Sequence, residues 1–259
     1  MSLSSQTQFT APPLDGSISF GQLVDFHLEH NPAWNYAILA LSTSGSAEPI
    51  HITYAELTKA VHRAAHVISP VKDGVPSLGT RNVIAIFAST DTLLYQAIVL
   101  AVLRSGNIVS CVLYPHRDRR TYSPMQPLPI SNRNSSAAVV NLLEKTACHY
   151  VIYGGASAIG HIAQESRRAL DAKAYDLAVI PLPKLDEIFV KLGNDGVNSS
   201  APFTPYPKIE KTISADSPAL ILHSSGSTGL PKPIVLTEHY VTSTLNMRKR
   251  CHPSDLIIR

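Results

Sequence analysis

A run of small polar residues at positions 224–229 is the part of the sequence best suited to bind a ligand. Serine, glycine and threonine fill every position of the run, and Lys232 follows inside Pro231-Lys232-Pro233. Small side chains let the backbone approach a ligand closely, glycine permits positive φ, and hydroxyl and amide groups form a concave donor surface that suits phosphate oxygens. The run therefore indicates a phosphate-binding loop to which Lys232 adds positive charge.

Flexible linkers have a similar composition, so the flanking residues decide between the two interpretations. The run lies between Ile221-Leu222 and the apolar residues 234–236, and the two prolines stiffen its exit. This favours a ligand loop between two buried strands. A Walker-type P-loop is excluded, because its second glycine and its Ser/Thr would fall on Pro231 and Pro233 when the frame is counted from Gly226.

The segment SSGSTGLPKP resembles the phosphate-binding signature of the adenylate-forming, or AMP-binding, superfamily of acyl-CoA synthetases, luciferases and adenylation domains of nonribosomal peptide synthetases. HITYAELTKA at residues 51–60 is similar to the first core motif of that family. Pro233 stands where most members have glycine, a variant similar to the fungal synthetase-like carboxylate reductases. The resemblance implies that the β- and γ-phosphates of ATP are held by Ser224, Ser225, Gly226, Ser227, Thr228, Gly229 and Lys232.

The resemblance also implies a reaction and its limits. Family members join a carboxylate to the α-phosphate of MgATP, releasing pyrophosphate and forming an acyl-adenylate. The likeness covers about the first half of a family domain, so we expect residues 16–259 to form a partial adenylation domain whose C-terminal half is absent. The family's Mg-binding acid, ribose-binding aspartate and C-terminal lysine have no counterpart in this chain. We therefore assign no catalytic residue and no metal ligand, and expect the chain to be inactive alone.

Two interpretations of function remain open at this point. The first is a fragment of an ATP-dependent, AMP-forming carboxylate-activating enzyme of the ligase type, whose partners are ATP with Mg and a carboxylic acid. The second is a non-catalytic interaction or regulatory protein that uses the truncated fold as a scaffold. Under either interpretation the truncated chain would expose the edge of a sheet, which predicts self-association.

Composition places the chain among ordinary globular proteins. Its 259 residues are 44% apolar, enough for one large domain or two small ones. A formal charge of +3 without a basic block indicates neither a nucleic acid nor a membrane surface as partner. The three cysteines, Cys111, Cys148 and Cys251, lack metal or redox spacing, and no apolar run approaches the roughly 18 residues that span a bilayer. We expect a cytoplasmic protein.

Alternating helix and strand patterns predict an α/β fold with a mostly parallel sheet flanked by helices. After a disordered leader at 1–15, Ser19 can cap a helix ending at residue 30, and Thr53 with Glu56 has the spacing of a capping box. The remaining expected elements are strands at 36–41, 50–52, 83–87, 150–153 and 177–180 and helices near 54–68, 91–105, 136–146, 158–172 and after Thr237. Residues 194–207 are typical of a surface excursion.

Residues 109–126 interrupt the pattern of the family. Without them the sequence reads SGNI-PLPISNRNSSAAVVNLL, which is similar to the fungal pattern, so we interpret this stretch as an insertion. Valine codons begin with GT and a glutamine codon can end in AG, the bases found at the two ends of an intron. The stretch is therefore either a translated, unspliced intron or a surface loop. In either case the charged residues 117–120 predict that the stretch loops out to solvent.

Overall fold

The computed structural model describes residues 8–39, 48–113, 135–155, 157–209, 213–224 and 230–250. Its helices are η1 (Phe20–Gln22), α1 (Leu23–His30), α2 (Tyr54–Ile68), α3 (Thr92–Arg104), α4 (Ser136–Lys145), α5 (Ser157–Asp171), α6 (Leu185–Ile188) and α7 (Glu238–Arg250). Its strands are β1 (Asn35–Leu39), β2 (Ile50–Thr53), β3 (Val71–Lys72), β4 (Val75–Pro76), β5 (Val83–Ser89), β6 (Ile108–Leu113), β7 (Tyr150–Gly155), β8 (Ala178–Pro181), β9 (Pro218–Ser224) and β10 (Lys232–Thr237).

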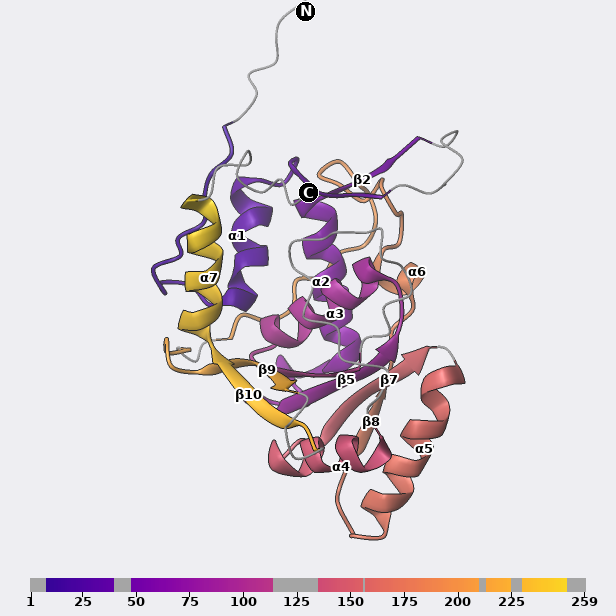
Figure 1. The fold of residues 1–259 in the computed structure, drawn as a ribbon. Coiled ribbons are helices and arrows are strands. Elements are labelled where there is room, and N and C mark those ends of the chain that lie inside the picture. The colour runs from indigo at the N-terminus through magenta and orange to yellow at the C-terminus, as the bar shows by residue number, and fades with distance from the viewer. Residues whose placement is uncertain are drawn as a thin grey trace, which may run out of the picture.

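A six-stranded sheet with the order β10-β9-β6-β5-β7-β8 organises the chain (Figure 1). The strands from β9 to β8 run parallel to their neighbours, and β10 alone in this sheet pairs antiparallel, with β9. The expected α/β fold with a mostly parallel sheet is therefore confirmed. β1 with β2 and β3 with β4 form two small antiparallel ribbons.

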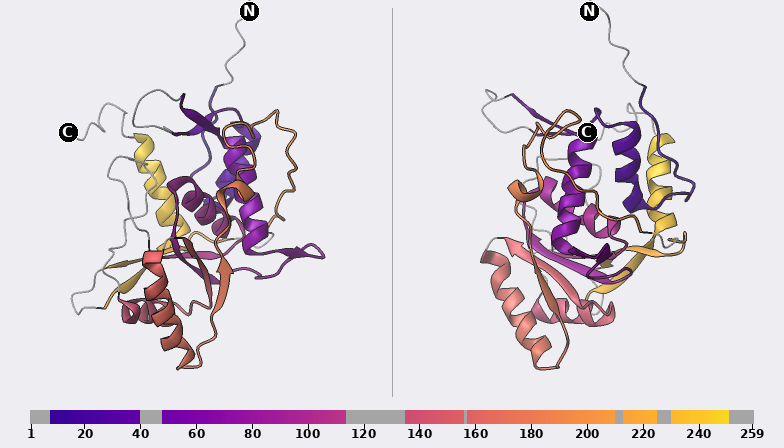
Figure 2. Two further views of the ribbon diagram at one scale, coloured as in Figure 1. Left: turned by 90° about the vertical axis from the view of Figure 1, so that its right-hand side faces the viewer. Right: turned by 180° about the vertical axis from the view of Figure 1, so that it is seen from behind.

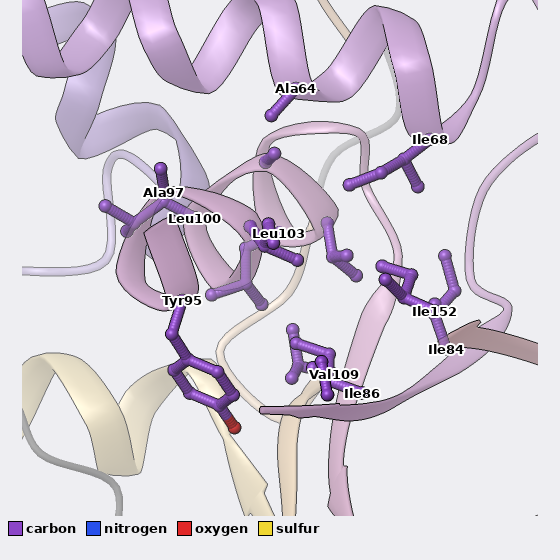
Figure 3. Packing of buried hydrophobic residues seen from close by; sticks show 14 of the residues in the cluster. Ala64, Ile68, Ile84, Ile86, Tyr95, Ala97, Leu100, Leu103, Val109 and Ile152 are labelled. Carbon is purple, nitrogen blue, oxygen red and sulfur yellow. The ribbon is translucent and has the colours of Figure 1, made fainter. Parts of the chain in front are cut away.

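Helices cover both faces of the large sheet (Figures 1 and 2). α2 and α3 lie against one face together with α1 and α7, and α4 and α5 lie on the other. The core between α2, α3 and the sheet is apolar, as the packing of Ala64, Leu100, Ile86, Val109 and Ile152 shows (Figure 3). Residues 84–88 of β5 are all buried, as expected for a strand covered on both faces.

Side-chain caps explain where several helices begin. The Asp91 carboxylate accepts a hydrogen bond from the Leu94 N–H at 2.8 Å, and Thr53 Oγ1 accepts one from the Glu56 N–H at 3.2 Å. Glu56 does not complete the expected capping box, because its Oε1 accepts the Gly193 N–H at 2.6 Å. The same glutamate thus joins α2 to a segment 137 residues away in sequence.

The expected disordered leader at residues 1–15 is wrong for residues 8–15. Asn31 at the end of α1 accepts the Thr10 N–H at 2.8 Å and donates to the Thr10 carbonyl at 2.7 Å. The Phe9 ring contacts Trp34 edge-on, with centroids 5.4 Å apart. These contacts order the segment against the N-terminal helix, an outcome that its polar composition did not indicate. Residues 1–7 lie outside the described residues.

The expected solvent loop at 109–126 is wrong for its first residues. Val109 is fully buried, and residues 108–113 form β6, which pairs with β5 on one side and β9 on the other. The apolar residues of this stretch fit a central strand. Without β6, the sheet could not be continuous between β5 and β9. Residues 114–134, including the charged run, lie outside the described residues, so the insertion itself stays a prediction.

The expected surface excursion at 194–207 is also partly wrong. Asp195 is fully buried, and Tyr206 is 1% exposed. The Asp195 carboxylate lies 2.6 Å from Arg63 Nη1 and 3.4 Å from Lys59 Nζ, both on α2. A buried charge needs such partners, and they fasten the segment to the helix.

Candidate functional site

The predicted phosphate loop connects the two strands of a hairpin. β9 ends at Ser224 and β10 begins at Lys232, and these two residues pair directly across the hairpin. Of the seven predicted ligand-binding residues, the structure therefore places Ser224 and Lys232 side by side at the base of the loop. The other five, residues 225–229, lie outside the described residues.

The loop lies at the edge of the sheet where the parallel strands end. β9 runs parallel to β6, and β6, β5, β7 and β8 run parallel to one another, so the residues after Ser224 follow the carboxyl end of a parallel strand. α3 begins after β5 at the same edge, and α5 begins after β7. In open α/β sheets, ligands gather at this edge because successive loops converge there.

The β10 side of the hairpin differs from the sequence-based expectation. Two buried strands were expected to flank the loop, and Ala219 and Ile221 of β9 are buried as expected. β10 instead forms the border of the sheet, where Ile234 is 45% and Val235 52% exposed. A short apolar run does not reveal by itself whether its strand lies inside a sheet or at the edge.

Two side chains that sequence reasoning missed hold this hairpin in place. Asn141 on α4 donates from Nδ2 to the Pro231 carbonyl at 3.0 Å, beside the start of β10. Beyond the other end of β10, Glu238 is 8% exposed and accepts the Phe20 N–H of η1 at 2.8 Å. Burial raises the pKa of the Glu238 carboxyl, although the hydrogen bond from Phe20 opposes the shift. The partners in these two contacts are 90 and 218 residues apart, so no local sequence pattern indicates them.

The start of α7 agrees with the sequence. The sequence predicts a helix after Thr237, and the Thr237 Oγ1 caps that helix by accepting the Tyr240 N–H at 3.2 Å. Lys232 is exposed, and no ion pair joins it to another residue that the structure describes.

The strongest clusters of charge in the described part of the chain fasten helices and do not line the loop. His62 lies between the Asp25 carboxylate, 2.9 Å from Nε2, and the Tyr206 N–H, 2.8 Å from Nδ1, and Arg104 forms an ion pair with Asp25 at 2.8 Å. Burial raises the pKa of Asp25, but the His62 hydrogen bond and the Arg104 charge outweigh it and hold the pKa below its usual value. The Nδ1 contact fixes the ring as an acceptor there, so Nε2 donates to Asp25.

Other chemistry is limited in the described residues. No group of three or more His, Cys, Asp or Glu side chains among them could hold a metal ion. Cys148 is buried, and burial raises the pKa of its thiol to about 11, so at neutral pH it carries no thiolate. No described helix is long and apolar enough to cross a membrane.

Comparison with curated proteins finds fungal relatives much longer than this chain. The chain is 32% identical over 251 residues to the adenylate-forming reductase Nps11 of Serpula lacrymans, which covers 94% of the chain and 20% of the relative. It is 35% identical over 227 residues to Nps9 of the same fungus, covering 87% of the chain and 18% of the relative. The chain thus spans about a fifth of the length of these curated relatives.

Comparison with solved structures finds the same fold at low sequence identity. The N-terminal domain of FACL13 from Mycobacterium tuberculosis aligns with a TM-score of 0.54 at 16% identity, covering 85% of this chain and 44% of that one. A luciferase-like enzyme from the mealworm Zophobas morio aligns with a TM-score of 0.53 at 17% identity, covering 89% and 45%. The fold is that of the N-terminal part of adenylate-forming enzymes.

The comparison with family models agrees with both results. The model of the AMP-binding enzyme family matches residues 29–258, which include every element from β1 to α7 and the whole of the predicted phosphate loop. The chain belongs to the AMP-binding enzyme family.

Proposed function

We propose that this chain is part of an ATP-dependent, AMP-forming enzyme that activates a carboxylic acid, and that it binds the β- and γ-phosphates of ATP through Ser224–Lys232. The observation that carries the proposal is the hairpin at the carboxyl edge of the sheet, where Ser224 and Lys232 face each other across the base of the loop. This position combines exposed positive charge with a loop of small donors.

The chemistry of adenylation explains why such a loop is needed. A carboxylate must approach an anionic α-phosphate, and pyrophosphate must leave with its negative charge stabilised. Lys232 and the hydroxyl and amide groups of the loop would hold that leaving group. Magnesium would enter with the phosphates of ATP, and the described residues supply no cluster of ligands for it. We therefore assign no step to a metal site in this chain.

We further propose that the chain on its own binds nucleotide without completing the reaction. Removing one oxyanion-type donor costs roughly 2.7–4 kcal/mol in transition-state stabilisation. By resemblance, several groups of comparable importance belong to parts of the family domain that this chain does not include. The identity of the acid would be decided by those parts as well.

Titration calorimetry with MgATP tests the proposal. The wild-type chain should bind MgATP, and Lys232→Ala should weaken binding about tenfold or more, because a charge-assisted contact contributes about 1.5–3 kcal/mol. Gly226→Ala should also weaken it by restricting the loop. Lys191→Ala changes an exposed lysine elsewhere and serves as the control. Equal affinities in all four chains would remove the loop from the site.

The exposed edge of the sheet favours a second role, self-association. Within the described residues, no second strand pairs with β10 on its outer side, where Ile234 and Val235 are each about half exposed. Unpaired edges with apolar side chains recruit further strands. We propose that two copies of this chain, or one copy and another strand, pair along β10. This is also the surface that a purely interaction-based function of the chain would use.

A further inference from the structure

We propose that the chain carries a binding site for one small, neutral aromatic molecule between the large sheet and the helices α4 and α5, separate from the phosphate loop. A cavity of about 550 Å³ lies there. Its floor is made by Ala85 and Phe87 of β5 and Tyr153 of β7, and its roof by Val139 of α4 and Gly160 and Ala163 of α5. Figure 2 shows these helices on the face of the sheet opposite α2.

Small residues at facing positions create the space. Gly160 and Ala163 on α5 and Ala85 on the sheet line the same cavity, so among the described residues these lining positions carry no large side chain. A methyl group added at Gly160 would meet nothing closer than the Tyr153 hydroxyl at 3.7 Å. Native interiors are close-packed, and the volume of this cavity lies within the range of small-molecule sites, about 300–1,000 Å³.

The lining selects the chemistry of the ligand. The Phe87 and Tyr153 rings lie nearly parallel across neighbouring strands, with centroids 6.0 Å apart and an interplanar angle of 25°. They offer an aromatic surface that carries the Tyr153 hydroxyl. Of the other neutral polar groups in the lining, the Ser166 hydroxyl donates to the Ser136 carbonyl at 3.4 Å and Gln164 is exposed. A flat aromatic molecule with one hydrogen-bond acceptor would match this surface, since aromatic rings stack and a single polar group fixes orientation.

Charges at the rim argue for a neutral ligand. Arg167 lies at the edge of the cavity, but its Nε donates to Asp171 at 2.8 Å and its Nη1 to the Leu177 carbonyl at 3.1 Å. His161 lies 3.6 Å from Glu165 in the next turn of α5. Arg167 and His161 already have partners in Asp171, the Leu177 carbonyl and Glu165, so an anionic ligand would gain little from them. The exposed Val179 on β8 adds an apolar border.

The cavity is distinct from the phosphate loop, although α4 touches both. Val139 and Leu143 line the cavity, whereas Asn141 points to Pro231 at the exit of the loop. Binding in the cavity can therefore be measured without nucleotide. The result of that measurement does not depend on whether the loop binds ATP.

The test uses prodan, a neutral naphthyl ketone whose fluorescence rises and shifts to the blue in apolar sites. The folded wild-type chain should bind it saturably with a stoichiometry of one. Ala163→Leu should fill the cavity and weaken binding at least tenfold, and Val139→Phe should do the same from α4. Ala169→Leu is the matched control: it makes the same alanine-to-leucine change on the exposed side of α5 and should leave prodan binding unchanged.

Circular dichroism melts and sedimentation velocity accompany each titration. If Ala163→Leu fails to fold, Val139→Phe supplies the same test from the other helix. Tyr153→Phe should weaken prodan binding roughly three- to tenfold by removing the hydroxyl donor. The proposal is overturned if the folded wild-type chain does not bind prodan, if a second copy closes the cavity, or if cavity-filling variants bind as the Ala169→Leu control does.

Discussion

Asn141 holds the exit of the predicted phosphate loop with one hydrogen bond, from its Nδ2 to the Pro231 carbonyl. We expect Asn141→Ala to weaken MgATP binding about three- to tenfold, because the loss of one hydrogen bond of about 0.5–1.5 kcal/mol lets the start of β10 move. Titration calorimetry measures the change. Asn198→Ala alters an exposed asparagine and serves as control, and Asn141→Gln, which keeps the donor, should restore part of the affinity. Unchanged affinity in Asn141→Ala would exclude this positioning role.

Asp195 fastens residues 189–207 to α2 through Arg63 and Lys59. Asp195→Ala should lower the free energy of unfolding by about 3–5 kcal/mol, because it leaves two largely buried cations without their shared carboxylate. Urea denaturation measures the loss. Asp186→Ala, a change on the exposed surface of α6, should cost little.

The contribution of Asp195 to the free energy of unfolding should depend on pH. Burial raises its pKa, but hydrogen bonds from Ser199 and Arg63 outweigh this and lower the pKa below the ordinary value of 3.8. An acid with a lowered folded-state pKa stabilises the fold above its unfolded-state pKa and loses this effect as pH falls through the folded-state value. The stability difference between wild type and Asp195→Asn should therefore be constant near neutral pH and shrink below about pH 4. A difference that grows in acid would contradict the assignment.

At the scale of elements, β10 is an apolar strand at a border of the large sheet, and its Ile234 and Val235 side chains are about half exposed. If copies pair along it, sedimentation velocity should show an association that strengthens with protein concentration. Ile234→Lys should shift the chain to monomer, since charged residues on an edge oppose strand addition. Val197→Lys introduces the same charge at an exposed valine away from the sheet and should not. Association that survives Ile234→Lys would place the contact elsewhere.

Most elements could be predicted from local patterns, and their long-range contacts could not. Signals within a few residues predict the helix near 91–105, the helix after Thr237 and the buried strand at 83–87. The structure adds that Asp91 and Thr237 cap the two helices. Glu56 shows the limit of this reasoning, because its spacing fits a capping box while its carboxylate binds Gly193. The apolar residues at 109–113 are consistent with a strand, but comparison with the family pattern assigns them to an insertion, and for this reason β6 was not predicted.

At the scale of the molecule, the sheet order decides where the two strands that flank the predicted phosphate loop lie. β9 is far from β6 in sequence but pairs with it in parallel, so the end of β9 at Ser224 lies at the same edge of the sheet as the starts of α3 and α5. The residues of the loop could be identified from the sequence by their types. Its place at the sheet edge and its support by Asn141 and Glu238 required the fold.

The central claim is that Ser224–Lys232 binds the β- and γ-phosphates, and the most direct test is the ratio of ATP to AMP affinity in the wild-type chain and in Lys232→Ala. AMP lacks both phosphates, so the wild type should prefer MgATP at least tenfold, and Lys232→Ala should remove most of that preference while changing AMP affinity little. A wild-type chain that binds ATP and AMP equally, or a preference for ATP that persists in Lys232→Ala, would contradict the account.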